Sequence, residues 1–146
     1  MGYLVNDNFI IRRRFVIEQL EVQFMDAGQP YTLVSTNLSF YAIPVFCNLR
    51  AAANQTTPYD AFVHIYLTNT ANYGVGQICA TYSQNASGLG VIDNNQYHAM
   101  LVNFQSAPSR FGGINGNKDL QIFWDVLPAV GDGDLIVDLG YIIQPI

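Results

Sequence analysis

The sequence has little charge and almost no lysine. Only 12% of its 146 residues are charged, whereas a typical soluble domain carries about 25%. Between residues 27 and 92 the only charged side chains are Arg50 and Asp60, Lys118 is the one lysine, and the basic residues cluster only at 12–14. Binding to a nucleic-acid duplex depends on neutralising several phosphates. We therefore expect no nucleic-acid partner.

Other signals are missing as well. No run approaches the roughly 18 apolar residues that span a bilayer, and the N-terminus lacks the charged and apolar regions of a signal peptide. We expect neither membrane insertion nor a signal peptide. Two cysteines, Cys47 and Cys79, are too few for a disulfide framework, and we expect both to be buried as small apolar residues. The length fits one domain, which we divide into an apolar arm or first strand at 1–14 and a sandwich at 15–146.

What the sequence does contain is a series of segments rich in Val, Ile, Phe and Tyr. Many alternate with period 2, which is typical of strands, and glutamate, a good helix former, occurs only twice. These patterns predict eight principal strands, at 15–25, 31–35, 38–47, 60–67, 75–83, 97–104, 120–127 and 134–143. Segments 9–11 and 89–92 would add further pairing.

Three of these segments predict which side chains share a face. Segment 15–25 would place Leu20, Val22 and Phe24 together. In 97–104, His98 and Met100 would lie opposite Tyr97 and Ala99. In 120–127, the side chains expected to face inward are Leu120, Ile122, Trp124 and Val126, with Gln121 and Asp125 outward.

The connectors are rich in Gly and Asn, and Gly131-Asp132-Gly133-Asp134 predicts a tight turn before the last strand. Many short strands separated by turns predict an all-β fold, an antiparallel β-sandwich. About eight strands favour the jelly roll, which solves the problem of unpaired edges with two sheets. Pro44 lies within a strong strand pattern, so we expect an edge or a bulge there.

Catalytic signals are weak. His64 and His98 both lie within alternating strands, and the nucleophile elbow Gly-x-Ser-x-Gly is absent. We expect a protein that is not an enzyme and needs no cofactor. Asp132, Asp134 and Asp138 could bind calcium through carboxylate oxygens, but turn propensity alone explains Gly-Asp-Gly-Asp, so we expect no metal.

Arg12-Arg13-Arg14 lies between two apolar triplets, and three adjacent like charges require partners. One interpretation pairs them with aspartates of the same fold. The other pairs Arg12 and Arg14 with carboxylates of a neighbouring subunit, because arginine binds carboxylates with two hydrogen bonds.

Both termini are apolar, although free chain ends are usually polar and frayed. Together with the sparse charge, this predicts a homo-oligomer, with a trimer as the expected form, because interface cores are depleted in charged residues. The side chains expected at the interface, with Arg12 and Arg14, are Tyr3, Leu4, Val5, Phe9, Ile10, Ile11, Tyr141, Ile143 and Ile146.

An alternative function rests on aromatic residues in loops. Surrounded by amide and hydroxyl side chains, aromatic rings could lie beneath a sugar. The alternative is thus a lectin-like module, suited to host attachment, whose candidate residues are Tyr59, Tyr73, Tyr82 and Phe111.

The apolar arm Tyr3–Ile11, the Asn- and Gln-rich surface of low charge and the apolar tail Tyr141–Ile146 give the chain an overall character. In this character it resembles the small jelly-roll proteins of virus particles, particularly phage capsid decoration proteins and the knobs of head or tail fibres. The resemblance covers the whole chain without a diagnostic motif, so no functional residue carries over. It implies a non-enzymatic, oligomeric component located in the virion, which contacts other virion proteins or a surface glycan.

Overall fold

The computed structural model describes residues 9–35, 40–59, 64–68, 78–83, 92–94, 97–102 and 119–145. In these residues, seven strands have four or more residues, and two have only two. The elements, in chain order, are β1 (Ile11–Ile17), α2 (Gln19–Val22), β2 (Tyr31–Val34), β3 (Phe40–Ala51), β4 (His64–Thr68), β5 (Ile78–Ser83), β6 (His98–Ala99), β7 (Leu101–Val102), β8 (Leu120–Trp124) and β9 (Leu135–Pro145).

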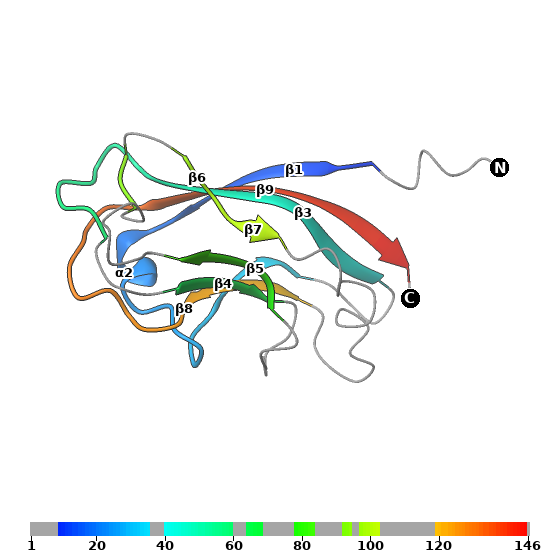
Figure 1. Cartoon of the computed structure of the whole chain (residues 1–146), viewed down its shortest axis with the longest axis horizontal. Helices are drawn as coiled ribbons and strands as arrows, with labels where there is room; N and C mark the ends of the chain where they lie inside the picture. Colours follow the sequence, from blue (N-terminus) through cyan, green and yellow to red (C-terminus); the bar gives the residue numbers. More distant parts are fainter. Residues whose placement is uncertain are drawn as a thin grey trace.

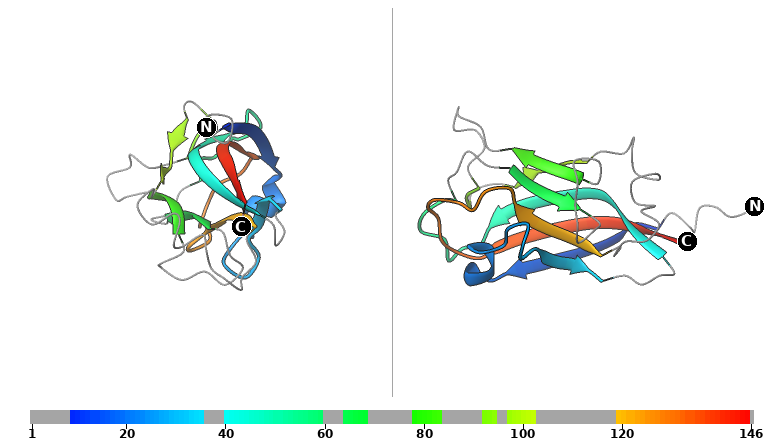
Figure 2. Two further views of the ribbon diagram at one scale, coloured as in Figure 1. Left: turned by 90° about the vertical axis from the view of Figure 1, so that its right-hand side faces the viewer. Right: turned by 90° about the horizontal axis from the view of Figure 1, so that it is seen from below.

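The strands form two antiparallel sheets. One has four strands in the order β1-β9-β3-β6, and the other has five in the order β2-β8-β4-β5-β7. The sheets lie one above the other (Figure 1), and Figure 2 shows the same two layers from one end and from below. The expected all-β antiparallel sandwich is therefore confirmed.

The core lies between the sheets and follows the alternation of the strands. Every second residue of β9 from Leu135 to Tyr141 is at most 5% exposed, and Ile65, Leu67 and Trp124 of the opposite sheet are fully buried. Successive side chains of a strand point to opposite faces, so burying one face of each sheet removes much apolar surface from water. Arg12 and Arg14 on β1 are accordingly left on the outer face.

Proline at position 44 produces the expected irregularity in β3. The pairing of β3 with β9 shifts register between Pro44 and Phe46. On the other side of β3, β6 pairs only with Asn48 and Leu49. Because proline has no N–H to donate to a neighbouring strand, it is tolerated at this bulge, where the described residues give β3 only one neighbour.

The single long strand predicted at 15–25 is wrong. β1 ends at Ile17, and a helical turn follows in which the Val22 amide donates to the Glu18 carbonyl at 2.9 Å. Val22 is fully buried, whereas Leu20 is 71% and Phe24 is 58% exposed. An alternating sequence thus folds as a helix because groups from elsewhere hold it: the carboxylate of Asp134 accepts from the Gln19 amide at 2.9 Å.

The predicted inward position of Val126 is also wrong. β8 ends at Trp124, whose backbone amide donates to the Met25 carbonyl and whose indole donates to the Val22 carbonyl, both at 2.8 Å. The chain turns there to meet the α2 segment, so Val126 is 60% exposed. Gln121, expected to face outward, is 7% exposed.

The alternation predicted for 97–104 is confirmed for the side chains described in it. His98 and Met100 are buried, and Tyr97 and Ala99 are exposed. The segment serves both sheets, because β6 pairs with β3 and β7 pairs with β5. The expected boundary between residues 14 and 15 falls inside β1, which pairs with β9 over its whole length.

Candidate functional site

The outer face of the β1-β9-β3-β6 sheet carries most of the described basic side chains. The strand register places three residues in each cross-strand row: Arg12, Gly140 and Phe46 form one row. Arg14, Asp138 and Asn48 form the next. Side chains directly opposite each other on neighbouring strands lie within contact distance, so each row is a unit of the surface.

In the first row, a glycine makes room for an aromatic ring. A Cβ atom on Gly140 would lie 2.1 Å from Cε1 of Phe46, closer than real atoms approach. The Phe46 ring therefore lies over the Gly140 backbone, and the guanidinium carbon of Arg12 lies 5.7 Å from the ring centroid. A cation at this distance from an aromatic face is attracted to it, which positions Arg12 without neutralising its charge.

The second row contains an ion pair with two hydrogen bonds. Arg14 donates from Nε to Oδ1 of Asp138 at 2.7 Å and from an Nη to Oδ2 at 3.0 Å. The same Nη lies 2.9 Å from the Tyr97 hydroxyl. The hydrogen bond with Arg14 lowers the pKa of Asp138 and raises the pKa of Arg14. For Arg14, the partner is thus an aspartate of the same fold.

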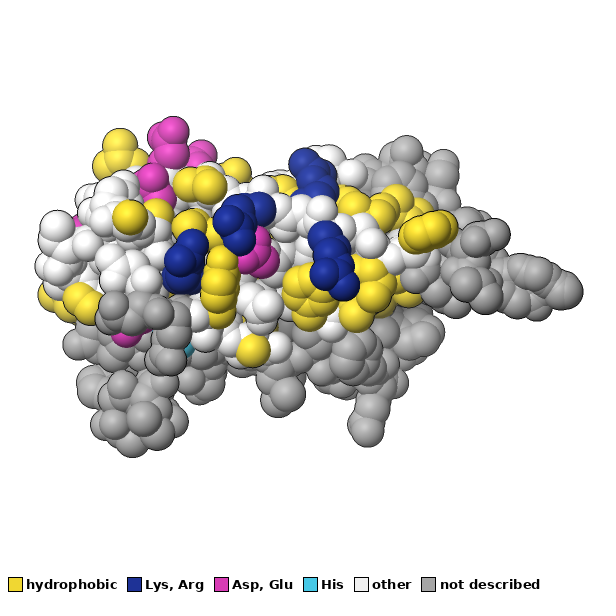
Figure 3. Space-filling view, turned by 90° about the horizontal axis from the view of Figure 1, so that it is seen from above, with side chains coloured by type: hydrophobic (Ala, Val, Ile, Leu, Met, Phe, Trp, Pro, Cys, Tyr) yellow, Lys and Arg dark blue, Asp and Glu magenta, His cyan; other side chains and the backbone are white. Residues whose placement is uncertain are grey.

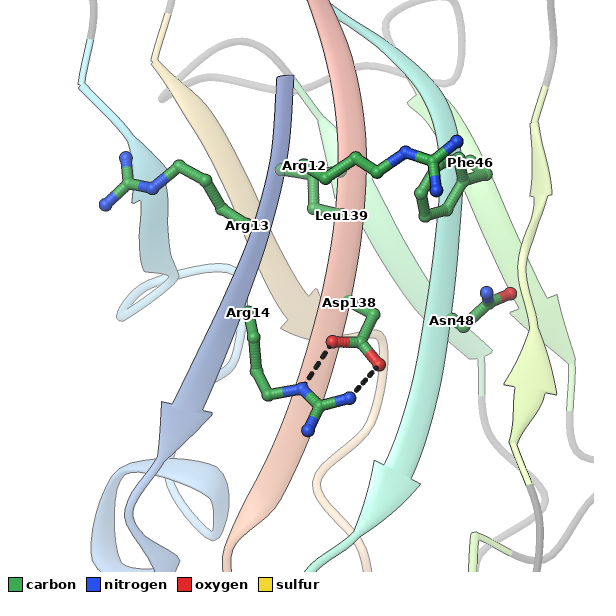
Figure 4. A pocket seen from close by; sticks show the side chains of 7 residues that line it. All are labelled: Arg12, Arg13, Arg14, Phe46, Asn48, Asp138 and Leu139. Carbon is green, nitrogen blue, oxygen red and sulfur yellow. Dashed lines mark hydrogen bonds and ion pairs between the residues drawn. The ribbon is translucent and has the colours of Figure 1, made fainter. Parts of the chain in front are cut away.

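Aromatic rings also hold the remaining described arginines. The guanidinium carbon of Arg13 lies 4.9 Å from the Phe15 ring centroid, and that of Arg50 lies 4.8 Å from the Tyr97 ring centroid. In Figure 4, Arg12 and Arg14 reach over the sheet, whereas Arg13 points to the other side of β1. Neither Arg12 nor Arg13 has an ion-pair partner in the described part of the chain.

An open hollow of about 560 Å³ lies at the two cross-strand rows. Figure 4 draws the residues that line it, which are Arg12, Arg13, Arg14, Phe46, Asn48, Asp138 and Leu139. The three arginines and Asp138 in this lining give it a charge of +2, in a chain whose net charge is −5, so the other residues together carry −7. Figure 3 shows the basic side chains spread over this face. The face is thus complementary to an acidic partner.

The residues expected at an oligomer interface divide into three groups. Phe9, Ile10 and Ile143 are exposed by 72%, 41% and 39%. Tyr141 is only 5% exposed and Ile11 is half-buried against the core, so both pack mainly within their own subunit. The candidates outside the described residues are Tyr3, Leu4, Val5 and Ile146.

A second hollow, of about 330 Å³, lies beside α2. Its lining includes the exposed side chains of Leu20 and Phe24 and the side chain of Glu21. Neither the Glu18 nor the Glu21 carboxylate has a hydrogen-bond or ion-pair partner among the described residues. The sequence did not predict this site, because its alternation assigned Leu20 and Phe24 to one face of a strand.

The predicted sugar platform loses one of its members. Tyr59 is fully buried, its hydroxyl donates to the Gly133 carbonyl, and its ring lies 5.8 Å from that of Trp124. Burial raises the pKa of its hydroxyl, and the charges of Asp132 and Asp134 add to this. Tyr59 therefore cannot offer a ring face to a sugar. Tyr73 and Phe111 lie outside the described residues, as does the side chain of Tyr82 on β5, so the glycan interpretation stays a prediction that rests on these three.

The three aspartates considered for calcium have separate partners. Asp132 accepts hydrogen bonds from the Thr56 and Thr57 amides at 2.6 and 2.8 Å and from the Thr56 hydroxyl. These bonds lower the pKa of Asp132. Asp134 caps α2 at the Gln19 amide, and Asp138 binds Arg14. Within the described ranges, no group of three or more acidic, His or Cys side chains is arranged to hold a metal ion.

Two further titratable candidates, His98 and Cys47, are buried. His98 is 7% exposed and its Nε2 lies 3.6 Å from Oδ1 of Asp93, while the His64 side chain is outside the described set. Cys47 is a free, buried thiol, and burial raises its pKa to about 12. The predicted burial is thus confirmed for Cys47, and the Cys79 side chain is not among those described.

Among the described residues no helix is long and apolar enough to cross a membrane, and α2 has only four residues. No protein-family model matches the chain. No curated protein and no solved structure matched it either.

Proposed function

We propose that this chain is a non-enzymatic structural protein that associates with copies of itself, and that it serves as a capsid decoration or fibre protein of a virus particle. The observation that carries the self-association is the apolar end of the β1-β9-β3-β6 sheet. Phe9, Ile10 and Ile143 are all exposed there.

These side chains belong together because of the strand register. Ile11 pairs with Tyr141 at the start of β1, so Phe9 and Ile10 leave the sheet at the same end at which β9 continues to Ile143. Single exposed apolar residues are normal on a protein surface, whereas a cluster of them marks an interaction site. The described residues of this end contain no acidic side chain, which agrees with the charge depletion of interface cores.

The order of the strands supports the finer assignment to the jelly roll. If β6 and β7 are counted as one strand that passes from one sheet to the other, eight strands remain. The sheets then contain strands one, eight, three and six, and strands two, seven, four and five, the latter continued by the second half of strand six. This order supports a jelly roll, a fold used by viral capsid proteins and by lectins. The virion assignment is an analogy at the level of the fold.

Substitutions at the apolar end test the proposal. Phe9→Ser combined with Ile143→Ser should convert the oligomer to monomers, measured by light scattering, and leave the melting temperature nearly unchanged, because both side chains are exposed. Val126→Ser is the matched control, since Val126 is also exposed but lies after β8. An oligomer that survives the double substitution would refute this interface.

A further inference from the structure

Two regions at opposite ends of β1 carry complementary charge and exposed apolar side chains. At its start, Phe9 and Ile10 precede Arg12 and Arg13. Directly after it come Glu18 and α2, whose Glu21 lines a hollow together with Leu20 and Phe24. We call the first region the basic end and the second the acidic end. Figure 3 shows acidic side chains gathered toward the α2 end of the molecule.

The charges of the basic end are not neutralised within the described part of the chain. Arg12 lies over Phe46 and Arg13 lies over Phe15, and neither contacts a carboxylate there. Rings position these guanidinium groups but carry no counter-charge. Their N–H edges can therefore still bind carboxylates with two hydrogen bonds.

The acidic end is the counterpart. Glu18 and Glu21 are both exposed, and neither carboxylate has a partner among the described residues. Leu20 and Phe24 are 71% and 58% exposed at the same place. The hollow between them and Tyr31, of about 330 Å³, is large enough for an apolar side chain. A hollow lined mainly by apolar side chains, with Glu21 in its lining and Glu18 three residues earlier in the chain, fits an apolar residue that is followed by arginines.

The two ends cannot meet within one copy. Glu18 comes six positions after Arg12 along β1 and its end, and a strand rises about 3.3 Å per residue, so their backbones lie about 20 Å apart. Pairing with β9 from Ile11 to Ile17 holds β1 straight over this length. In Figure 1, β1 runs from the end where β9 finishes toward α2 at the other.

We infer that a second copy of this chain binds head to tail, with Phe9 and Ile10 of one copy in the α2 hollow of the next and Arg12 and Arg13 against Glu18 and Glu21. The inference rests on the proposed self-association and names the two surfaces that meet. Because these surfaces differ, the contact is heterologous, and it generates a closed ring or an open filament. A trimer is one of the closed forms.

Charge reversal at each end tests the contact in the full chain. Arg12→Glu with Arg13→Glu, and separately Glu18→Arg with Glu21→Arg, should each weaken association about tenfold or more, because like charges then face each other. A chain that carries all four substitutions should return to within about threefold of the natural affinity. Light scattering over a concentration series measures each dissociation constant, and the melting temperature checks that each variant folds.

A mixture gives a second, independent measurement. The two reversed variants should associate with each other when mixed, although neither self-associates, because each then supplies the end that complements the other. Asp125→Lys is the control and should leave the mass unchanged, since Asp125 is exposed, unpartnered in the described part and absent from the hollow. If the Arg12 substitution disturbs the Phe46 contact and folding, Arg13→Glu alone leaves that contact intact.

The outcomes separate this inference from the proposed function. A natural chain that remains monomeric refutes both. An oligomer that both reversals leave intact, or that the fourfold variant fails to restore, refutes the head-to-tail contact and leaves self-association standing, and so does a mixture in which the two variants do not bind each other. Weakening by Arg12 and Arg13 reversal alone, with no effect at Glu18 and Glu21, would show that the basic end binds a different acidic surface and would also overturn the inference.

Discussion

Arg14 and Asp138 lie opposite each other on β1 and β9 and share two hydrogen bonds, of 2.7 and 3.0 Å. The pair joins two residues 124 positions apart in the chain. It ties an edge strand to its neighbour on a face where every other described charge is positive. Asp138 thus limits the repulsion between the arginines of this surface.

Removing the carboxylate should therefore destabilise the sheet. Asp138→Asn loses the ion pair with Arg14 and leaves Arg50 and Arg14 without a nearby negative charge, so the melting temperature at neutral pH should fall. Thermal denaturation followed by the fluorescence of Trp124, the one tryptophan, measures this. Asp125→Asn is the control, because Asp125 has no partner in the described part. An equal effect of the two substitutions would contradict the assigned role.

Stability should fall in acid through Asp132. Hydrogen bonds with Thr56 and Thr57 lower its pKa below the ordinary 3.8. A carboxylate whose pKa is lower in the folded state stabilises fully above the pKa of the unfolded chain and loses this effect as pH falls through the folded pKa. The melting temperature of the natural chain should drop below about pH 4, and that of Asp132→Asn should drop less steeply. Parallel pH dependences for the two chains would contradict this explanation.

Gly140 should not tolerate a methyl group. A Cβ atom there would lie 2.1 Å from the Phe46 ring, so Gly140→Ala should cost about 1–3 kcal/mol in the free energy of unfolding, measured with urea. Phe46→Ala removes the clash, so Gly140→Ala should cost clearly less in that background. Gly28→Ala, whose nearest atom would lie 3.3 Å away, is the control. Additive effects at 140 and 46 would show that the ring does not occupy the glycine's space.

The Cys47 thiol should be unreactive in the folded chain. It is 1% exposed and its pKa is about 12, so almost no thiolate forms at pH 8 and reagents cannot reach it. In a Cys79→Ser variant, an aromatic disulfide reagent should label no thiol under native conditions and one per chain in denaturant. Rapid labelling of the folded variant would place Cys47 at the surface.

The strands were largely predictable because their alternation is local. A period of 2 at 134–143 indicates β9 without knowledge of any other segment, and the core then follows from its buried face. The α2 turn was not predictable in this way. Leu20, Val22 and Phe24 alternate as in a strand, and the groups that favour the helix, Asp134 and Trp124, come from distant parts of the chain.

The site was predictable only in its composition. The sequence identifies Arg12–Arg14 as a cluster in need of partners, but the partner of Arg14 depends on a register between strands at opposite ends of the chain. The same holds for the space that Gly140 leaves for Phe46. Strand pairing likewise decides which exposed apolar residues lie together, so a local sequence pattern cannot predict this.

The most direct test of self-association is the mass of the natural chain in solution. One chain has a mass of 16.2 kDa. Light scattering coupled to size exclusion, at concentrations from micromolar upward, should give a whole multiple of this value, threefold for the expected trimer. A mass of 16.2 kDa that does not change over the whole concentration range would contradict the central claim.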